Sequence, residues 1–338
     1  MKYVLITDQH FGLKNESEKF HENFQLFYDK VFFPYLEKSG IKNIIHLGDV
    51  FHARKKIDTQ TLALAKRYFF DRLEAMDIKV DILLGNHDVY YKESNVPNAP
   101  ALVLKNYKNV TVYDSYYELG NILLLPWINK NNAEDVYDIL KSTKCNVVMA
   151  HLELKGFKLN KKTTTDFGMS PKIFSRFDMV LSGHFHTKHS IDHIHYLGAP
   201  TEHTWIDVND KKGFHEFDSK TLDLKFIENP YTMFTIMKYE ENVDIDLTLV
   251  ENRYVKLYAD GIEDRTHLNS LVDKIEKVCY DLTLIEDSNV DLSTVDSENI
   301  EVEDTSEIIK NYVLQLENIP HQAIYDLMNK AYLEANSI

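Results

Sequence analysis

The chain has 338 residues, 44% of them hydrophobic and 27% charged, which is enough for one large domain with smaller additions. Two cysteines without a CxxC spacing argue against a disulfide framework and against a thiolate metal site. No apolar run approaches membrane-spanning length, and the run before Asp8 is too short for a signal peptide, so we expect a cytoplasmic protein without a membrane partner.

Strand and helix patterns alternate over the first 90 residues. Apolar runs at 4–7, 43–47 and 80–84 enclose a helical repeat over 18–38 and a second one that begins at Asp58 or Thr59. This β-α-β-α-β order predicts a parallel sheet.

The pattern of expected strands and helices changes in the middle of the chain. Residues 104–128 are typical of short strands and turns, and residues 131–142 of a helix, before apolar runs at 147–150 and 179–182. Short strands without helices between them then follow at 194–197, 213–218, 222–227 and 231–238. These features predict an α/β (α+β) fold, a two-sheet sandwich flanked by helices whose second sheet is largely antiparallel.

Five apolar runs end in residues that can bind metal ions. The candidate ligands are Asp8, His10, Asp49, Asn86, His151, His184 and His186. Because ligands of open α/β sheets bind beyond the carboxyl ends of strands, we expect these side chains to converge. A mixed oxygen and nitrogen set without thiolate suits Mn, Fe or Zn, and two neighbouring ions need a shared carboxylate, for which Asp49 is the best candidate.

The same motifs resemble a known family. DxH, GDxx, GNH[DE], a lone His and GHxH, in this order, are similar to those of the calcineurin-like metallophosphoesterases. GDVFH, the GNHD ending and the context His151-Leu152-Glu153-Leu154 resemble the SbcD-type double-strand-break repair nucleases, above all the short phage recombination endonuclease subunits. The resemblance covers residues 1–240, weakens beyond them, and implies the same two-sheet fold.

The resemblance implies two metal sites. Asp8, His10, Asp49 and His186 then hold one ion, and Asp49, Asn86, His151 and His184 hold the other. Since purple acid phosphatases carry a tyrosine where this chain has His52, two divalent ions are expected, Mn²⁺ by resemblance or Mg²⁺ as the alternative.

Two further histidines are candidate catalytic residues. His87 would remain free beside the metals, where it can protonate the leaving 3′-oxygen. His52 would orient His87 or contact the phosphate; simple packing is its other interpretation.

The resemblance also implies an activity. We expect a DNA nuclease that removes nucleotides from duplex ends, cuts single strands, and works with an SbcC-type coiled-coil ABC ATPase in DNA repair, recombination and replication, in the host cytoplasm if it is encoded by a phage. The alternatives are a stand-alone phosphomonoesterase or cyclic-nucleotide phosphodiesterase of the same superfamily, and a metal-binding assembly protein with an inactive site. The full ligand set and the retained His87 argue against the inactive protein.

Exposed basic and aromatic residues follow the metal motifs. The first basic loop is Arg54-Lys55-Lys56, and the second holds Lys155, Lys158, Lys161 and Lys162. Both either grip DNA phosphates or are ordinary solvated surface. Tyr90 and Tyr91 could stack on a displaced base.

The C-terminal third is expected to divide into smaller parts. After a nuclease domain at 1–240, residues 243–280 form either a small capping, DNA-binding module or a β-α appendage that covers a sheet edge. Residues 281–307 hold ten acids and no base, which is typical of a solvated linker. Residues 308–338 contain two amphipathic helices that we expect to bind the ATPase rather than fold back on the body. A homodimer is left open.

Overall fold

The computed structural model describes residues 1–286 except 162, 242, 263 and 264. Residues Met1–Asp287 form one compact unit. Most of the expected linker, the whole of the expected partner-binding tail at 308–338, and Lys162 of the second basic loop lie outside the described residues.

A six-stranded sheet is built from the two ends of the main domain. Its order is β14-β13-β1-β2-β3-β6, with β14 at Leu224–Glu228, β13 at Gly213–Asp218, β1 at Lys2–Ile6, β2 at Asn43–His46, β3 at Lys79–Leu83 and β6 at Val110–Tyr113. Strands β1, β2 and β3 run parallel, as the alternating pattern over the first 90 residues predicted, and β6 adds a fourth parallel strand.

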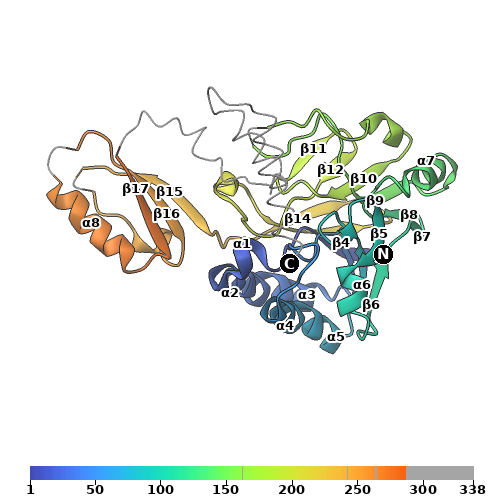
Figure 1. Ribbon diagram of the computed structural model, residues 1–338, viewed down its shortest axis with the longest axis horizontal. Coiled ribbons are helices and arrows are strands. Elements are labelled where there is room, and N and C mark those ends of the chain that lie inside the picture. Colours follow the sequence, from blue (N-terminus) through green and yellow to red (C-terminus); the bar gives the residue numbers. More distant parts are fainter. Residues whose placement is uncertain (162, 242, 263–264, 287–338) are drawn as a thin grey trace, which may run out of the picture. The chain divides into compact units, whose positions relative to one another are not determined.

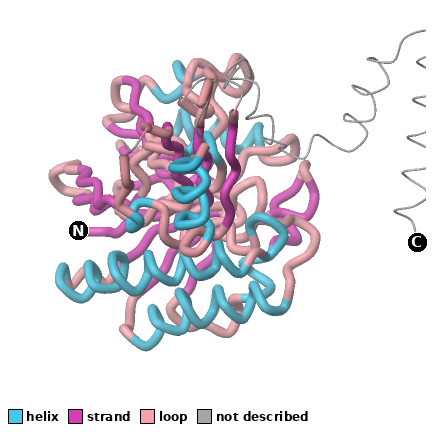
Figure 2. Tube along the Cα trace, turned by 90° about the vertical axis from the view of Figure 1, so that its left-hand side faces the viewer, coloured by secondary structure: helices cyan, strands magenta, loops and turns pink. Residues whose placement is uncertain are grey.

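Helices cover one face of this sheet. They form the runs α2 (Glu18–Phe27), η1 (Tyr28–Phe32), α3 (Phe33–Ser39) and α4 (Thr59–Ala65), η2 (Lys66–Phe70), α5 (Asp71–Ala75), preceded by the short α1 (Leu13–Glu16). Asp58 caps α4, since its carboxylate accepts the Gln60 N–H at 2.7 Å. Figures 1 and 2 show these helices side by side, and their aromatic side chains pack on Val4, Ile6 and Ile44 of the sheet.

A second six-stranded sheet packs against the first. Its order is β11-β12-β10-β9-β8-β7, with β11 at His189–Ile191, β12 at Ile194–Tyr196, β10 at Met179–Gly183, β9 at Val147–His151, β8 at Ile122–Leu125 and β7 at Tyr117–Leu119. Helix α7 (Ala133–Ser142) covers its outer face (Figure 1), and the 3-10 turn η3 (Pro171–Phe174) belongs to the same core.

Alternating side chains join the two sheets. Tyr3 and Leu5 of β1 face the second sheet, where they share a buried core with Leu124 and Met149, whereas Val4 faces the helices. Successive residues of a strand point to opposite faces. A strand such as β1, which lies between the helices and the second sheet, therefore needs apolar side chains on both faces. This confirms the sandwich flanked by helices.

The expected composition of the second sheet was wrong in two respects. Strands β12, β10, β9 and β8 are parallel, and only the outer strands β11 and β7 pair antiparallel. The hairpin β13–β14 joins the first sheet instead, since β13 pairs antiparallel with β1. The two strands of a hairpin pair with each other, so a hairpin can be added to a free edge of either sheet. The local sequence does not specify which sheet it joins.

A small α/β module follows the two sheets. Strands β15 (Phe234–Lys238), β16 (Tyr254–Tyr258) and β17 (Asp281–Ile285) form a parallel sheet packed on α8 (Thr266–Glu276), with the short turn η5 at Leu247–Leu249. Thus β15 precedes the expected boundary at 240, and β17 lies in the stretch for which a linker was expected. Phe20 of α2 contacts the rings of Phe234 and Tyr254, which ties the module to the main domain.

The remaining described elements are short. They are the hairpin β4 (Val89–Tyr91) and β5 (Ser94–Asn98), the helix α6 (Ala99–Val103), and the turn η4 (Trp205–Asp207). No helix in the described part of the chain is long and apolar enough to cross a membrane.

Candidate metal centre

The candidate ligands sit on loops that leave the same edge of the two sheets. Asp8 and His10 follow β1, Asp49 follows β2, and Asn86 follows β3. In the second sheet, His151 is the last residue of β9, while His184 and His186 follow β10. The structure therefore brings all seven predicted ligands together, as expected for the carboxyl ends of parallel strands.

The loops after β1 and β2 support each other through their backbones. The Asp8, His10 and Phe11 N–H groups donate to the carbonyl oxygens of Gly48, Asp49 and Val50 at 2.9–3.1 Å. Asp8, His10 and Asp49 have positive φ angles of 51°, 48° and 57°. Such angles are uncommon outside glycine and persist only where the surroundings fix them, so the fold holds these ligands against a local conformational cost.

Close packing also explains Gly85. A Cβ atom at this position would lie 2.0 Å from Asp49 Oδ1 and 2.5 Å from the Asp49 backbone nitrogen. The absence of a side chain at Gly85 therefore lets the loop after β3 reach the Asp49 carboxylate.

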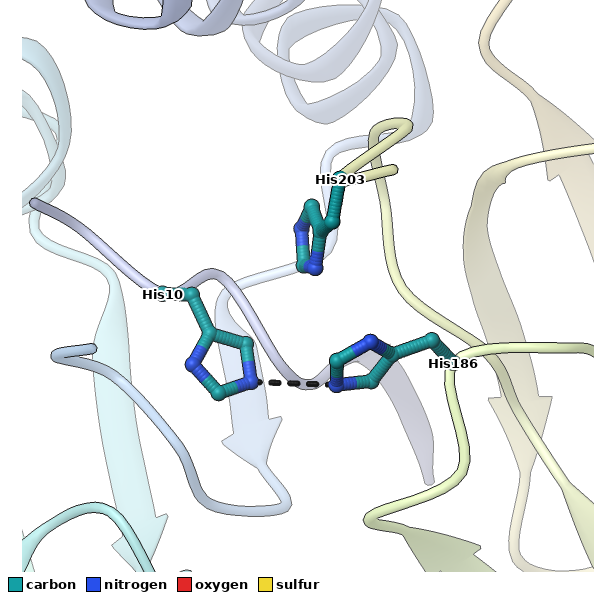
Figure 3. Close-up of side chains that lie close together, drawn as sticks. All are labelled: His10, His186 and His203. Atoms are coloured by element: carbon teal, nitrogen blue, oxygen red, sulfur yellow. Dashed lines mark hydrogen bonds between the residues drawn. The ribbon is translucent and has the colours of Figure 1, made fainter. Parts of the chain in front are cut away.

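The first group of ligands surrounds the point between His10 and His186. Their Nε2 atoms lie 3.1 Å apart (Figure 3). His10 Nε2 also lies 3.5 Å from Asp49 Oδ2 and 4.0 Å from Asp8 Oδ1. His186 Nε2 is 3.8 Å from Asp8 Oδ1. The ligand atoms of Asp8, Asp49 and His186 thus all lie within 4.0 Å of His10 Nε2, a spacing at which the four side chains can contact one ion.

The second group approaches the same oxygen of Asp49. His151 Nε2 is 3.4 Å from Asp49 Oδ2, and Asn86 Oδ1 lies 3.1 Å from His151 Nε2 and 2.9 Å from His184 Nδ1. His151 Nδ1 faces the Leu47 carbonyl oxygen at 2.7 Å, so its N–H can donate there and leave Nε2 free as a ligand. The Asp49 carboxylate is thus shared by both groups.

The two candidate catalytic histidines stack beside the first group. The rings of His52 and His87 have centroids 5.4 Å apart with 18° between their planes. His87 Nδ1 lies 2.6 Å from the His52 carbonyl oxygen, and the His87 N–H donates to Asp49 Oδ1 at 2.8 Å. The backbone of His52 therefore orients the His87 ring, while the His52 ring lies against His10, with 3.4 Å between their Nδ1 atoms.

Burial and neighbouring charges set the protonation of the centre. Burial raises the pKa of Asp8 to about 7. Burial acts in the same direction on Asp49, but the imidazoles of His151, His87 and His10 together outweigh it and hold the pKa of Asp49 well below its usual range. Burial also lowers the pKa of His10 and His184 well below their usual value, so both imidazoles stay neutral. Burial lowers the pKa of His151, but the carboxylates of Asp49 and Asp8 outweigh burial and raise it to about 9. His10, His184 and Asp49 are therefore in the forms that bind a metal ion, whereas His151 must release its proton when an ion binds.

The donor set fits divalent cations. Among the described residues, four overlapping groups place possible ligand atoms within 4.8 Å of one another. They are Asp8 with His10 and Asp49, Asp49 with His151 and His184, His10 with His186 and His203, and His10 with His52 and His87. Carboxylate, amide and imidazole donors without a thiolate suit borderline ions such as Mn²⁺, Fe²⁺ or Zn²⁺.

Asp88 supports the centre in a way that its motif did not reveal. Its buried carboxylate accepts the N–H groups of Asp49 and Gly85 at 2.7 and 2.9 Å through Oδ2, and those of Val50 and Phe51 at 3.0 and 3.4 Å through Oδ1. One side chain therefore joins the loops after β2 and β3. From the sequence alone, the final Asp of GNHD could be a metal ligand or an acceptor of backbone hydrogen bonds. The folded structure shows that it is the acceptor.

His203 is a second residue that the sequence analysis missed. It lies in the loop between β12 and β13, away from any strand that ends at the centre, yet its ring centroid is 5.3 Å from that of His10 and 4.8 Å from that of His186. No spacing rule points to a histidine in such a long connection.

The basic and aromatic residues that follow the metal motifs in the sequence are placed as follows. Lys55 and Lys56 are exposed, with Lys55 Nζ 5.9 Å from the centroid of the Tyr90 ring. Tyr90 and Tyr91 are 40% and 54% exposed, so both can meet a ligand. Of the second basic loop, Lys155, Lys158 and Lys161 are exposed, and Lys161 donates to the Val208 carbonyl oxygen.

A protein-family model decides the family. The model of the calcineurin-like phosphoesterases matches residues 1–188, which contain every strand end and every predicted ligand described above. The chain belongs to the calcineurin-like phosphoesterases. It is accordingly a metal-dependent hydrolase of phosphate esters.

Individual relatives of this calcineurin-like phosphoesterase differ in how far they match. Exonuclease subunit 1 of Enterobacteria phage T4 is 29% identical over 342 residues, which cover 99% of both chains. An archaeal phosphodiesterase matches with a TM-score of 0.35 and 11% identity, over 68% of this chain and 100% of its own. A purple acid phosphatase from yellow lupin seeds matches with a TM-score of 0.35 and 12% identity, over 64% of this chain and 48% of its own.

Proposed function

We propose that this phosphoesterase is a two-metal DNA nuclease that acts on duplex ends as an exonuclease and on single strands as an endonuclease. The observation that carries the proposal is the Asp49 carboxylate, which lies 3.5 Å from His10 and 3.4 Å from His151, between two groups of ligands. A shared carboxylate is what two ions need in order to act on one phosphate.

The proposed ligands divide around this carboxylate. Asp8, His10, Asp49 and His186 would hold one ion, and Asp49, Asn86, His151 and His184 the other. When bound, two such ions supply positive charge that stabilises both the entering and the leaving oxygen of a displacement at phosphorus. We propose Mn²⁺ for both positions because nitrogen donors suit it better than Mg²⁺.

His87 would supply the proton that the leaving group needs. Its Nδ1 faces the His52 carbonyl oxygen at 2.6 Å, which directs the opposite nitrogen, Nε2, away from the backbone. In that orientation Nε2 can give a proton to the 3′-oxygen as the phosphodiester bond breaks. His52 is a positioning residue in this scheme, and its ring stacks on His87.

DNA as the substrate is supported by similarity and by surface charge. The exonuclease subunit of phage T4 matches over nearly the whole of both chains, so the sequence similarity extends beyond the phosphoesterase core. The exposed Lys55 and Lys56 follow His52, where they can contact the phosphates that flank a scissile bond.

We further propose a partner. Because the relative is a subunit by name, a multi-protein nuclease is the natural setting, and an SbcC-type coiled-coil ATPase bound through residues 308–338 fits the apolar faces of that sequence. The processes served would be DNA repair, recombination and replication.

A substrate panel tests the proposal. The metal-free protein should cleave labelled duplex and single-stranded DNA after addition of Mn²⁺, and hydrolyse p-nitrophenyl phosphate and cyclic AMP far more slowly. Rapid turnover of either small ester without cleavage of DNA would favour the phosphomonoesterase or cyclic-nucleotide phosphodiesterase instead. Absence of any hydrolysis would favour the inactive assembly protein.

A further inference from the structure

His203 is a buried histidine whose ring has no hydrogen-bond partner. It is 1% exposed, and both Nδ1 and Nε2 lack a partner among the described residues. A buried polar group without a partner destabilises the fold, so such a group calls for a specific explanation such as a bound ion.

The ring points at the first group of ligands. Figure 3 shows His203 directed toward the pair formed by His10 and His186, whose Nε2 atoms lie 3.1 Å apart. One nitrogen from each of the three rings lies within 4.8 Å of the others, a spacing at which all three can contact a single ion. The planes of His10 and His186 stand at 87° and 78° to that of His203, so the rings do not stack on one another.

A buried ion pair holds the His203 loop to the His186 loop. The Asp207 carboxylate accepts the N–H groups of His203 and Thr204, each at 2.9 Å, and lies 2.6 Å from Lys212 Nζ. The same Lys212 Nζ donates to the His186 carbonyl oxygen at 2.8 Å. Because Lys212 is only 3% exposed, this link is part of the core and fixes the spacing between the two histidines.

We propose that His203 is an additional protein ligand of the metal ion held by Asp8, His10, Asp49 and His186. The inference rests on the proposed two-metal function and extends it to the kind of ion and its retention. A third imidazole makes this position richer in nitrogen than its neighbour and leaves fewer places for water. It should therefore hold its ion more tightly and select Mn²⁺ or another transition metal over Mg²⁺.

Metal binding tests the assignment without reference to DNA cleavage. Wild type, His203→Leu and His203→Gln are stripped with a chelator, dialysed against graded Mn²⁺ or Mg²⁺, and analysed for metal per chain. The proposal expects two Mn²⁺ of unequal affinity in wild type. The tighter one should be weakened at least about tenfold in both variants, with a smaller preference for Mn²⁺ over Mg²⁺.

A matched histidine and the melting temperature separate a ligand from a packing residue. His195 is half-buried and pairs with the Ser190 hydroxyl, so His195→Leu should bind both ions as wild type does. Metal-free His203→Leu should melt at or above the wild-type temperature because it loses unpaired polar atoms, while its stabilisation by Mn²⁺ should shrink.

Three results would overturn the proposal. Both His203 variants could bind two Mn²⁺ with wild-type affinity, in which case the proposed function would stand without it. Metal affinity could fall only together with a large drop in the metal-free melting temperature of both variants, which would show a structural role. Wild type could bind no Mn²⁺, and then the proposed two-metal function would fail as well.

Discussion

At the scale of single residues, the sequence identified side chains whose type and position after a strand both point to metal binding. Asp8, Asp49 and His151 meet these conditions, and the fold brings them together. His203 could not be found in this way, because its position depends on a buried ion pair between Asp207 and Lys212 that forms only in the folded chain. The spacing of residues in the sequence predicts local geometry, but it does not predict contacts that long loops make in the folded chain.

The proposed role of His87 makes a prediction about turnover and metal content together. In His87→Gln, two metal ions per chain should remain while DNA cleavage falls roughly 10²–10⁴-fold, the usual contribution of general acid catalysis. Elemental analysis and initial rates on the same preparation measure both. Loss of an ion from the variant would make His87 a ligand and remove it from the proposed role.

Asp88 makes a prediction about stability. In Asp88→Asn, the amide cannot accept four backbone N–H groups, so at least two of the groups now paired with Asp88 would lose their acceptor. We expect the free energy of unfolding of the metal-free protein to fall by roughly 2–5 kcal/mol, since each buried N–H group left without an acceptor costs about 1–3 kcal/mol. Urea unfolding measures this, and an unchanged midpoint and slope would show that the carboxylate is dispensable.

At the scale of elements, the parallel core was predictable and the placement of added strands was not. The alternation that predicts β1, β2 and β3 is encoded locally, whereas β13 extends the first sheet by pairing with β1, more than 200 positions earlier in the chain. Strand β17 was hidden by its acidic surroundings, although Leu282 and Leu284 pack in the core of the module. Composition averaged over a long window concealed a short alternating strand.

Strand β13 carries a buried histidine that predicts a pH dependence. Burial lowers the pKa of His215 to about 3, with Lys188 contributing in the same direction, against an ordinary value of 6.5. Between these values the unfolded chain takes up a proton that the folded chain excludes, so the free energy of unfolding should fall as pH falls from 6.5 toward 3. The stability that neutral His215 contributes is therefore present above pH 6.5 and lost below it.

The variant His215→Leu isolates this contribution. Its decline in stability with acid should be shallower than that of wild type by up to about 1.4 kcal/mol per pH unit. Urea unfolding of chelator-treated protein at pH 7, 5.5 and 4.5 gives the comparison. Parallel pH profiles for the two proteins would contradict the depressed pKa.

At the scale of the whole molecule, charge is divided unevenly along the chain. Residues 281–338 carry −11 of the net charge of −15, so the part that holds the metal centre is nearly neutral, and it has exposed lysines at 55 and 56, shortly after Asp49 in the sequence. A total charge that looks unfavourable for DNA binding thus reflects mainly residues outside the phosphoesterase domain.

The proposed role of the C-terminal residues predicts that DNA cleavage and partner binding can be separated by truncation. A chain that ends after Asp287 keeps β17 and every proposed ligand, so it should remain folded and retain metal-dependent cleavage. Binding of the ATPase and its ATP-driven stimulation should be lost, and Leu327→Asp with Tyr332→Asp in the full chain should weaken binding nearly as much. A truncated protein without a cooperative thermal transition would place residues 288–338 in its own core.

The central claim is that two ligand groups joined by Asp49 hydrolyse DNA. The most direct measurement is the rate of duplex cleavage by metal-free protein as Mn²⁺ is added, for wild type and Asp49→Asn, with bound metal determined alongside. We predict that wild-type activity appears as two ions bind, and that Asp49→Asn fails to hold both and keeps less than about 1% of the rate, because both ligand groups lose their common carboxylate. Substantial cleavage by Asp49→Asn, or wild-type cleavage without added metal, would contradict the account.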